Sequence, residues 1–315
     1  MKKLISLLVS LVILYFIYSR VGVAEIISLL RQSDPFWLFC GFFMFIPTTL
    51  LTSFRFRMLS SALTRVSMAE SIQLILAASS LNMVLPSKMG DIAKGYFVAD
   101  RNNSSKNDAF SLVVYEKFCD MLALLFLCVI GIFFYRNYNI FTLFFSLCIV
   151  SSFIFGMLMI GSQTFYTFFF KAFAKFAPKA VAGKIEKFYD SWDGVCSFLK
   201  SRTNLKLNVS YISVIIWLMH LLQIWFFIRM LNAYVPILSH MVLTPMSIFA
   251  GLLPFTFAGV GMRDAALIYF FEGYLTSVTA ASLGILCTLR YLIPALFGLI
   301  FLHKYLVNLK MKSKP

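Results

Sequence analysis

Two short stretches of the chain combine proline, glycine and an acid beside a base within apolar sequence. The first is LPSKMGDIAK at residues 85–94, and the second is LPFTFAGVGMRDA at residues 253–265. Proline removes a backbone donor and glycine permits unusual torsions, so each stretch should interrupt a helix and leave backbone polar groups unpaired. The helix that begins after each break offers free N–H groups, which suit a phosphate or a carboxylate. We therefore predict an anion-binding element at each break.

A third group of charges lies in the segment VVYEKFCDML, which contains Glu116, Lys117 and Asp120. Glu116 and Asp120 are four residues apart, so both carboxylates should face the same side of a helix. Two acids on one face repel each other, which predicts basic partners from other segments. The expected partners are Lys88, Lys94 and Arg263.

The composition indicates that membrane-spanning helices position these residues. The chain has 315 residues, a mean hydropathy of +0.85, 36 Phe and only 13% charged residues, which is more apolar side chain than a soluble core of this size buries. Apolar runs of roughly 16 to 25 residues recur, long enough to cross the bilayer as helices. Their lack of period-two alternation argues against strands. We predict an all-α polytopic membrane helix bundle of about eight transmembrane helices, with re-entrant or broken helices in two pseudo-repeated halves.

The expected spans are residues 4–19, 36–54, 118–135, 139–161, 209–228, 235–257, 265–289 and 290–306. The run 71–86 either crosses or turns back. If it is re-entrant, all but five of the 28 Lys and Arg residues fall on the N-terminal side, which the positive-inside rule makes cytoplasmic. The five exceptions are Arg20, Arg31, Arg136, Arg229 and Arg290. We therefore favour a re-entrant 71–86 and two cytoplasmic termini.

The predicted organisation is a single membrane domain over residues 1–315, with a first half at about 1–161 and a second half at about 209–306. Between them, an amphipathic linker at about 162–208 has aromatic and basic residues on separate helical faces. The aromatic face contains Phe165, Phe169, Phe173 and Phe176, and the basic face Lys171, Lys175 and Lys179. This pattern is typical of a helix lying over anionic headgroups, although an ordinary cytoplasmic helix packed on the bundle fits equally well.

Each charged position also has a structural interpretation. Asp91 and Asp264 could each stabilise the free N–H groups at the start of a helix, or pair with Lys88 and Arg263. The third group fits a belt of charges at the membrane interface. Arg290 fits a side chain that reaches outward or one that faces a cavity, and Arg55 and Arg57 fit cytoplasmic anchors. Because acids inside spans are costly and the Pro, Gly, acid and base arrangement recurs in both halves, we favour a pathway.

At these residues the chain resembles the family built on the transmembrane region of lysylphosphatidylglycerol synthases, also called the flippase-like domain family. That family carries Pro-x-Arg-x-Gly-Glu-x-x-Arg, then Glu-Arg-x-x-Asp, then a late Pro followed by Gly-x-Gly-x-Arg-Glu. The matching segments here are PSKMGDIAK at 86–94, EKFCD at 116–120, and Pro254 followed by GVGMRD at 259–264. Lys88, Lys94 and Lys117 stand where Arg is usual, and Asp91 and Asp264 where Glu is usual. Lysine lacks the planar fork of arginine, so the headgroup preference should differ.

The resemblance implies a bacterial or archaeal cytoplasmic (inner) membrane protein that moves or binds a lipid, such as an aminoacylated phospholipid or a polyprenyl-phosphate-linked sugar. Aminoacyl transfer in that family resides in a separate soluble domain, which we do not expect here because the sequence ends shortly after the last expected span. The expected substrate-binding residues are Pro86, Lys88, Gly90, Asp91, Lys94, Glu116, Lys117, Asp120, Pro254, Gly259, Gly261, Arg263, Asp264 and Arg290.

The leading hypothesis is a transporter without enzymatic activity, since no GxSxG, HExxH, Walker or Rossmann pattern occurs. The alternatives are a membrane-embedded transferase, and an accessory protein that presents a lipid to a separate synthase or glycosyltransferase. The expected partners are membrane lipids with anionic headgroups, and an oligomer is compatible with the sequence. No cofactor is expected, because the six cysteines show no ligand spacing, and nucleic acid is not implied because the basic charge is topological.

Overall fold

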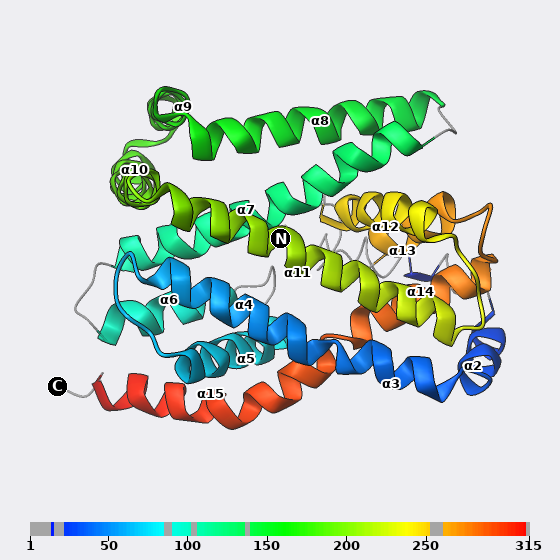
Figure 1. Ribbon diagram of the computed structural model, residues 1–315. Helices are drawn as coiled ribbons and strands as arrows, with labels where there is room; N and C mark the ends of the chain where they lie inside the picture. Colours follow the sequence, from blue (N-terminus) through cyan, green and yellow to red (C-terminus); the bar gives the residue numbers. More distant parts are fainter. Residues whose placement is uncertain are drawn as a thin grey trace.

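The computed structural model describes residues 14–15, 22–84, 90–101, 106–135, 139–252 and 261–312, and the regular elements within these ranges are all helices (Figure 1). Helical stretches long and apolar enough to cross a membrane are Pro35–Ser60, Asn107–Phe134, Ile140–Gly161, Thr203–Met230 and Ser277–Leu302. The predicted all-α polytopic membrane bundle is therefore confirmed. The expected span 4–19 lies almost entirely outside the described residues.

The long helices run roughly side by side, from left to right in Figure 1. They are α7 (Lys106–Phe134), α8 (Ile140–Gly161), α11 (Thr203–Met230) and the stretch formed by α3 (Pro35–Phe43) and α4 (Phe45–Ser60). The break between α3 and α4 at Met44 has a local cause, because Pro47 lacks an N–H and crowds the carbonyl one turn earlier. The outer face of α8 exposes Phe144 (67%) and Leu147 (61%), as expected where a helix meets lipid.

Helices α5 (Met68–Val84) and α6 (Gly90–Arg101) form an antiparallel pair. In Figure 1, α5 runs from the left-hand end toward the middle of the molecule, and α6 returns to the same end. Gly90 lies against the last turns of α5, where a Cβ would collide with the carbonyl oxygen of Ala78. This geometry agrees with a run that turns back within the bundle.

Helices α12 (Ile237–Leu252) and α13 (Met262–Phe270) form a second such pair that enters from the right-hand end (Figure 1). The expected span 265–289 is wrong, because residues 271–276 form a turn that separates α13 from α14 (Ser277–Leu289). Thr276 begins the new helix: its hydroxyl accepts a hydrogen bond from the Thr279 N–H at 3.2 Å.

The boundary expected between two spans at residue 290 also differs from the structure. Helix α14 continues into α15 (Leu292–Lys312), and the pair supplies the single candidate span Ser277–Leu302. The helix breaks at Arg290 and Tyr291 because Pro294 lacks an N–H and its ring crowds the carbonyl of residue 290. Arg290 therefore lies inside this candidate span, and the expected boundary between two spans at residue 290 is wrong.

Helix α15 holds the first helix pair by close packing. Gly298 faces the backbone of α5 so closely that a Cβ would collide with the carbonyl oxygen of Leu76. The Ser80 hydroxyl on α5 donates to the carbonyl oxygen of Ala295 at 2.5 Å. The two helices therefore meet almost backbone to backbone.

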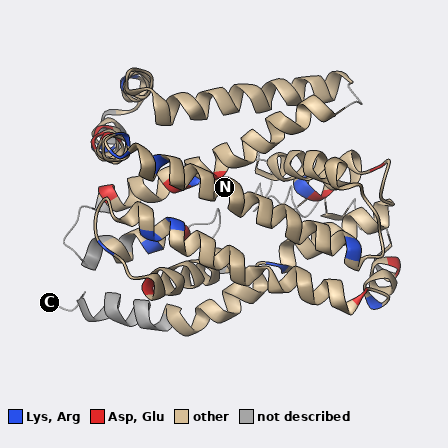
Figure 2. Cartoon of the chain, in the orientation of Figure 1, with Lys and Arg blue, Asp and Glu red and all other residues tan. Residues whose placement is uncertain are grey.

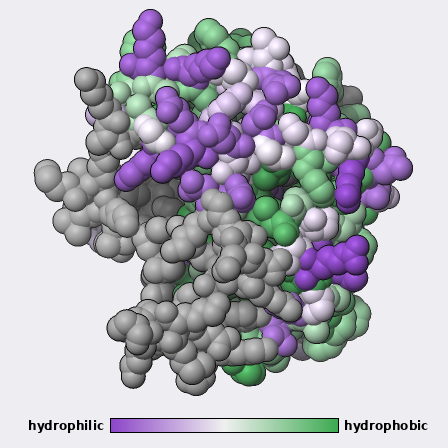
Figure 3. All heavy atoms as spheres, turned by 90° about the vertical axis from the view of Figure 1, so that its left-hand side faces the viewer, coloured by the Kyte–Doolittle hydropathy of each residue, from purple (hydrophilic) through white to green (hydrophobic). Residues whose placement is uncertain are grey.

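Three helices lie across the ends of the bundle and are seen nearly end-on in Figure 1. α2 (Val23–Arg31) lies at the right, and α9 (Gln163–Phe176) and α10 (Lys179–Lys200) lie at the left. Figure 2 shows charged residues mainly toward the ends of the helices and at a few interior positions, while α8 has none. Hydrophilic residues cover much of the described surface at the left-hand end (Figure 3).

Candidate functional site

A cluster of charged side chains from three helices lies inside the first half of the bundle. Helix α4 contributes Arg55, α6 contributes Asp91 and Lys94, and α7 contributes Glu116, Lys117 and Asp120. We call these six residues the first cluster. Glu116 and Asp120 share one helical face, as their four-residue spacing predicts, and both carboxylates bind the guanidinium of Arg55, which was not among the expected partners.

The inner part of the first cluster is closed to solvent. Glu116 is fully buried and accepts from Arg55 Nη2 at 3.0 Å and from Lys94 Nζ at 2.5 Å. Arg55 and Lys94 are each 1% exposed, and Arg55 Nη1 also donates to Asp120 and to the Ser213 hydroxyl on α11. Charged groups this deep persist only when they are paired. Each of these side chains has a partner of opposite charge, although Arg55 Nε is buried without a hydrogen-bond partner among the described residues.

The outer part of the cluster is more accessible. Lys117 is 42% exposed and binds Asp91 at 2.8 Å and Asp120 at 3.4 Å. The backbone carbonyl of Asp120 accepts from the Trp217 indole at 2.8 Å, which ties this edge to α11. With three cations and three carboxylates, the first cluster has no formal net charge.

A second cluster lies in the other half, at the start of α13. Arg263 donates to one carboxylate oxygen of Asp264 from Nε (3.0 Å) and Nη2 (2.7 Å), and Nη2 also reaches the Gly284 carbonyl and the Thr288 hydroxyl on α14. The other oxygen of Asp264 accepts from the Gly261 N–H at 3.1 Å. Gly261 has φ 96°, a conformation that favours glycine. Asp264 thus serves both as a helix-start residue and as the partner of Arg263.

Arg290 lies near this second cluster, at the break between α14 and α15. Its side chain is buried, with 6% exposure, and it donates to the Tyr291 hydroxyl at 2.7 Å and to Gln223 on α11 at 3.4 Å. The Gln223 amide in turn donates to the Gly41 carbonyl at 2.9 Å. Arg290 is therefore held by neutral groups.

The basic partners predicted for Glu116 and Asp120 are only partly correct. Lys94 binds Glu116 as expected, whereas Arg263 binds Asp264 in the other half. The role of surface anchor assigned to Arg55 is wrong, because its side chain is buried and joins Glu116 to Asp120; Arg57 is exposed. Sequence reasoning missed Arg55 because its partners lie more than 60 residues away, although an arginine inside an apolar helical run is itself a signal.

Pro86, Lys88, Pro254 and Gly259 lie outside the described residues. Among those that the structure describes, no ion pair or hydrogen bond joins the first cluster to the second. Convergence of the two breaks on one shared pocket therefore stays a prediction. Gly90 and Gly261 are both located at the starts of the return helices, as the two breaks require.

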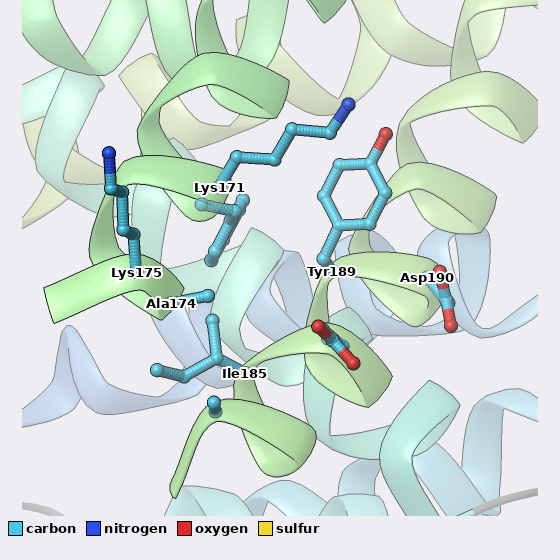
Figure 4. Close-up of a pocket in the computed structure, with 9 residues that line it drawn as sticks. Lys171, Ala174, Lys175, Ile185, Tyr189 and Asp190 are labelled. Atoms are coloured by element: carbon cyan, nitrogen blue, oxygen red, sulfur yellow. The ribbon is translucent and has the colours of Figure 1, made fainter. Parts of the chain in front are cut away.

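A separate groove of about 490 Å³ lies between α9 and α10 at the left-hand end (Figure 4). Phe170, Ala174 and Ile185 contribute apolar lining to this groove. Its charged lining consists of Lys171, Lys175, Glu186 and Asp190. The two helices are joined by the Tyr166 hydroxyl, which donates to Asp193 at 2.6 Å; burial and this bond raise the pKa of Tyr166. Both interpretations of α9 keep support, because Phe165 and Phe169 pack on Phe155 whereas Phe173 and Phe176 are exposed.

Comparison with known proteins identifies a family and a relative that this chain resembles. The family described as "Lysylphosphatidylglycerol synthase TM region" matches residues 3–298. The UPF0104 membrane protein MJ1595 of Methanocaldococcus jannaschii is 24% identical over 318 residues, which cover 95% of this chain and 94% of the relative. The match with the family spans both clusters and both helix pairs.

Proposed function

The chain belongs to the lysylphosphatidylglycerol synthase transmembrane-region family, and from this premise we propose that it translocates a lipid with an anionic headgroup across the cytoplasmic membrane. The headgroup is that of an anionic or aminoacylated phospholipid, or of a polyprenyl-phosphate-linked lipid. In this proposal both termini are cytoplasmic, because the positive-inside rule places the Lys-rich and Arg-rich side there.

One observation carries the proposal: each half of the bundle has buried charged side chains beside a helix that turns back toward its own end. Arg263 (9% exposed) and Asp264 (2%) lie at the start of α13, and Lys94 (1%) lies in α6. Ionisable groups inside a membrane protein are costly, and they are concentrated on substrate pathways. Helix pairs broken at corresponding places in two halves are likewise typical of transporter sites.

The proposed mechanism moves the headgroup through the bundle while the acyl or prenyl tails stay in lipid. The headgroup exchanges partners with the charged side chains, beginning at the accessible Lys117 edge, so its charge is not transferred into bare hydrocarbon. Because the tails remain outside, the pathway need not be wide enough for a whole lipid. The groove between α9 and α10 lies at the same end and offers basic and aromatic groups to anionic lipid.

The pairing of the carboxylates favours transport over the membrane-embedded transferase. A general base must accept a proton from its substrate. Glu116, Asp120 and Asp264 instead each accept hydrogen bonds from buried guanidinium or ammonium groups. The accessory role, in which the chain presents a lipid to a separate synthase or glycosyltransferase, is distinguished by whether the purified protein alone moves lipid.

Reconstitution into liposomes tests the proposal. A fluorescent phosphatidylglycerol is included in both leaflets, and a membrane-impermeant quencher reports how much of it reaches the outer leaflet. We expect protein-dependent translocation that is lost in the double variant Arg263→Ala and Asp264→Ala. The matched control is Glu25→Ala with Arg31→Ala, an exposed acid and base on α2, which should translocate like the wild type. Absence of translocation, or equal translocation by the double variant, contradicts the proposal.

A further inference from the structure

The buried charges of the two halves are unequally balanced. In the first cluster, three cations face three carboxylates within 4 Å. In the second half, Asp264 is bound by Arg263, and Arg290 adds a second cation. The described interior of the second half therefore has one formal positive charge in excess.

None of the acidic side chains that the structure describes forms an ion pair with Arg290. Apart from Asp100, whose side chain is outside the description, none of the 13 acidic residues of the chain lies within 4.0 Å of its guanidinium. The residues outside the described ranges include no Asp or Glu. A guanidinium does not lose its proton in proteins, so the charge stays in place.

The guanidinium also has unused donors. Of its five N–H groups, described hydrogen bonds engage one on Nη2, to the Tyr291 hydroxyl, and one on Nη1, to Gln223 at 3.4 Å. Nε is buried and has no hydrogen-bond partner among the described residues. A planar fork with free N–H groups matches two oxygens of a phosphate or carboxylate.

Arg290 lies close in sequence to a residue that contacts the second cluster. Thr288, two residues earlier in the last turn of α14, accepts from Arg263 Nη2 at 2.8 Å. The break that follows places Arg290 inside the candidate span, away from the helix ends where a long side chain could reach water. A ligand charge at this depth would remove the cost of burying an unbalanced cation.

We propose that Arg290 is the anion-binding residue of the second half and receives the single negative charge of a phosphodiester or carboxylate, the charge that one guanidinium balances. The inference rests on the proposed function only for the source of the anion, a lipid headgroup. The first cluster, balanced by its own carboxylates, instead tolerates headgroups with a further amine, because its exposed edge offers both signs of charge at Lys117 and Asp120.

Thermal unfolding of the purified protein in mild detergent tests this assignment. The probes are dihexanoylphosphatidylglycerol, the uncharged dihexanoylglycerol, and inorganic phosphate, each titrated against the midpoint temperature. A ligand that binds only the folded state raises this midpoint. The variants are Arg290→Gln, whose amide can still bond with Gln223 and Tyr291, and Arg290→Lys, which keeps the charge. Arg202→Gln, at an exposed arginine between α10 and α11, is the control.

For the wild type and Arg202→Gln we expect stabilisation by dihexanoylphosphatidylglycerol and none by dihexanoylglycerol. In Arg290→Gln the half-maximal concentration should rise by about tenfold to a hundredfold, the loss of a charge-assisted contact, and Arg290→Lys should fall between. Without any probe, Arg290→Gln should be at least as stable as the wild type, because it removes an unbalanced buried charge. If Arg290 had only a structural role, Arg290→Gln would leave the half-maximal concentration unchanged and would be less stable than the wild type without any probe.

Stabilisation of Arg290→Gln and the wild type at equal phosphatidylglycerol concentrations would overturn the assignment, as would absence of any anion effect on the wild type. An equal response to inorganic phosphate supports the anion site but identifies a free anion as its source. If Arg290→Gln loses binding while the wild type shows no translocation in liposomes, the anion site stands and the proposed transport function fails.

Discussion

Glu116 offers the sharpest test of how the first cluster is held together. Its carboxylate is fully buried and lies 3.0 Å from Arg55 and 2.5 Å from Lys94. In Glu116→Gln, Arg55 keeps Asp120, but the nearest remaining carboxylate to Lys94 is that of Asp91, at 3.9 Å. Removing one partner of a buried ion pair costs about 3–5 kcal/mol, and we expect a loss of this size. Adding Lys94→Met should recover at least about 2 kcal/mol, because the cluster again has no net charge.

SDS-induced unfolding in mixed micelles, followed by tryptophan fluorescence, measures this change in the free energy of unfolding. Trp217, whose indole donates to the Asp120 carbonyl beside the cluster, is one of the four tryptophans that contribute to this signal. The control Glu272→Gln changes an exposed acid in the turn 271–276 and should stay within about 0.5 kcal/mol of the wild type. If Glu116→Gln unfolds like that control, or if Lys94→Met fails to restore stability, the buried charges do not hold the cluster together in this way.

Three further predictions concern packing and the membrane surface. Gly284→Ala places a Cβ 2.6 Å from Asp264 Oδ1. In the unfolding and liposome assays, this substitution should lower the free energy of unfolding by about 1–3 kcal/mol and reduce translocation. The control Gly194→Ala, which has open space around it, should change neither. Gly298→Ala drives a Cβ into the Leu76 carbonyl and should separate α5 from α15, so that protease cleavage between α4 and α5 accelerates; unchanged cleavage would count against this packing. Phe176→Trp, at a side chain 87% exposed on α9, should gain fluorescence quenching by brominated lipids, more so in anionic liposomes, and no added quenching would favour a helix clear of the membrane.

Much of the first cluster follows from local sequence rules. The four-residue spacing of Glu116 and Asp120 predicts one shared helical face, and two acids on that face require cations. Lys94 follows from this reasoning, but Arg55 does not. Its contacts depend on the packing of α4 against α7 and α11, which no local pattern specifies.

The errors in the second half have a different physical origin. Residues 265–289 are apolar enough for one span, yet Glu272 and Gly273 lie in a turn and Thr276 caps the next helix. Hydropathy averages over these signals, whereas helix capping depends on single residues. The boundary expected at residue 290 follows from this error, because residues 290–306 form a separate span only if 265–289 is already one. Pro294 breaks the helix only locally, and α14 and α15 together supply one candidate span.

The break at Arg290 also has a mechanical consequence. On one side of it, α14 is tied to the second helix pair through the bonds from Arg263 to Gly284 and Thr288. On the other side, α15 is fastened to the first pair where Gly298 meets α5. A change of angle at this joint would therefore alter the position of one helix pair relative to the other. Arg290 lies at this joint, so an anion bound to its guanidinium would act directly on a connection between the two halves.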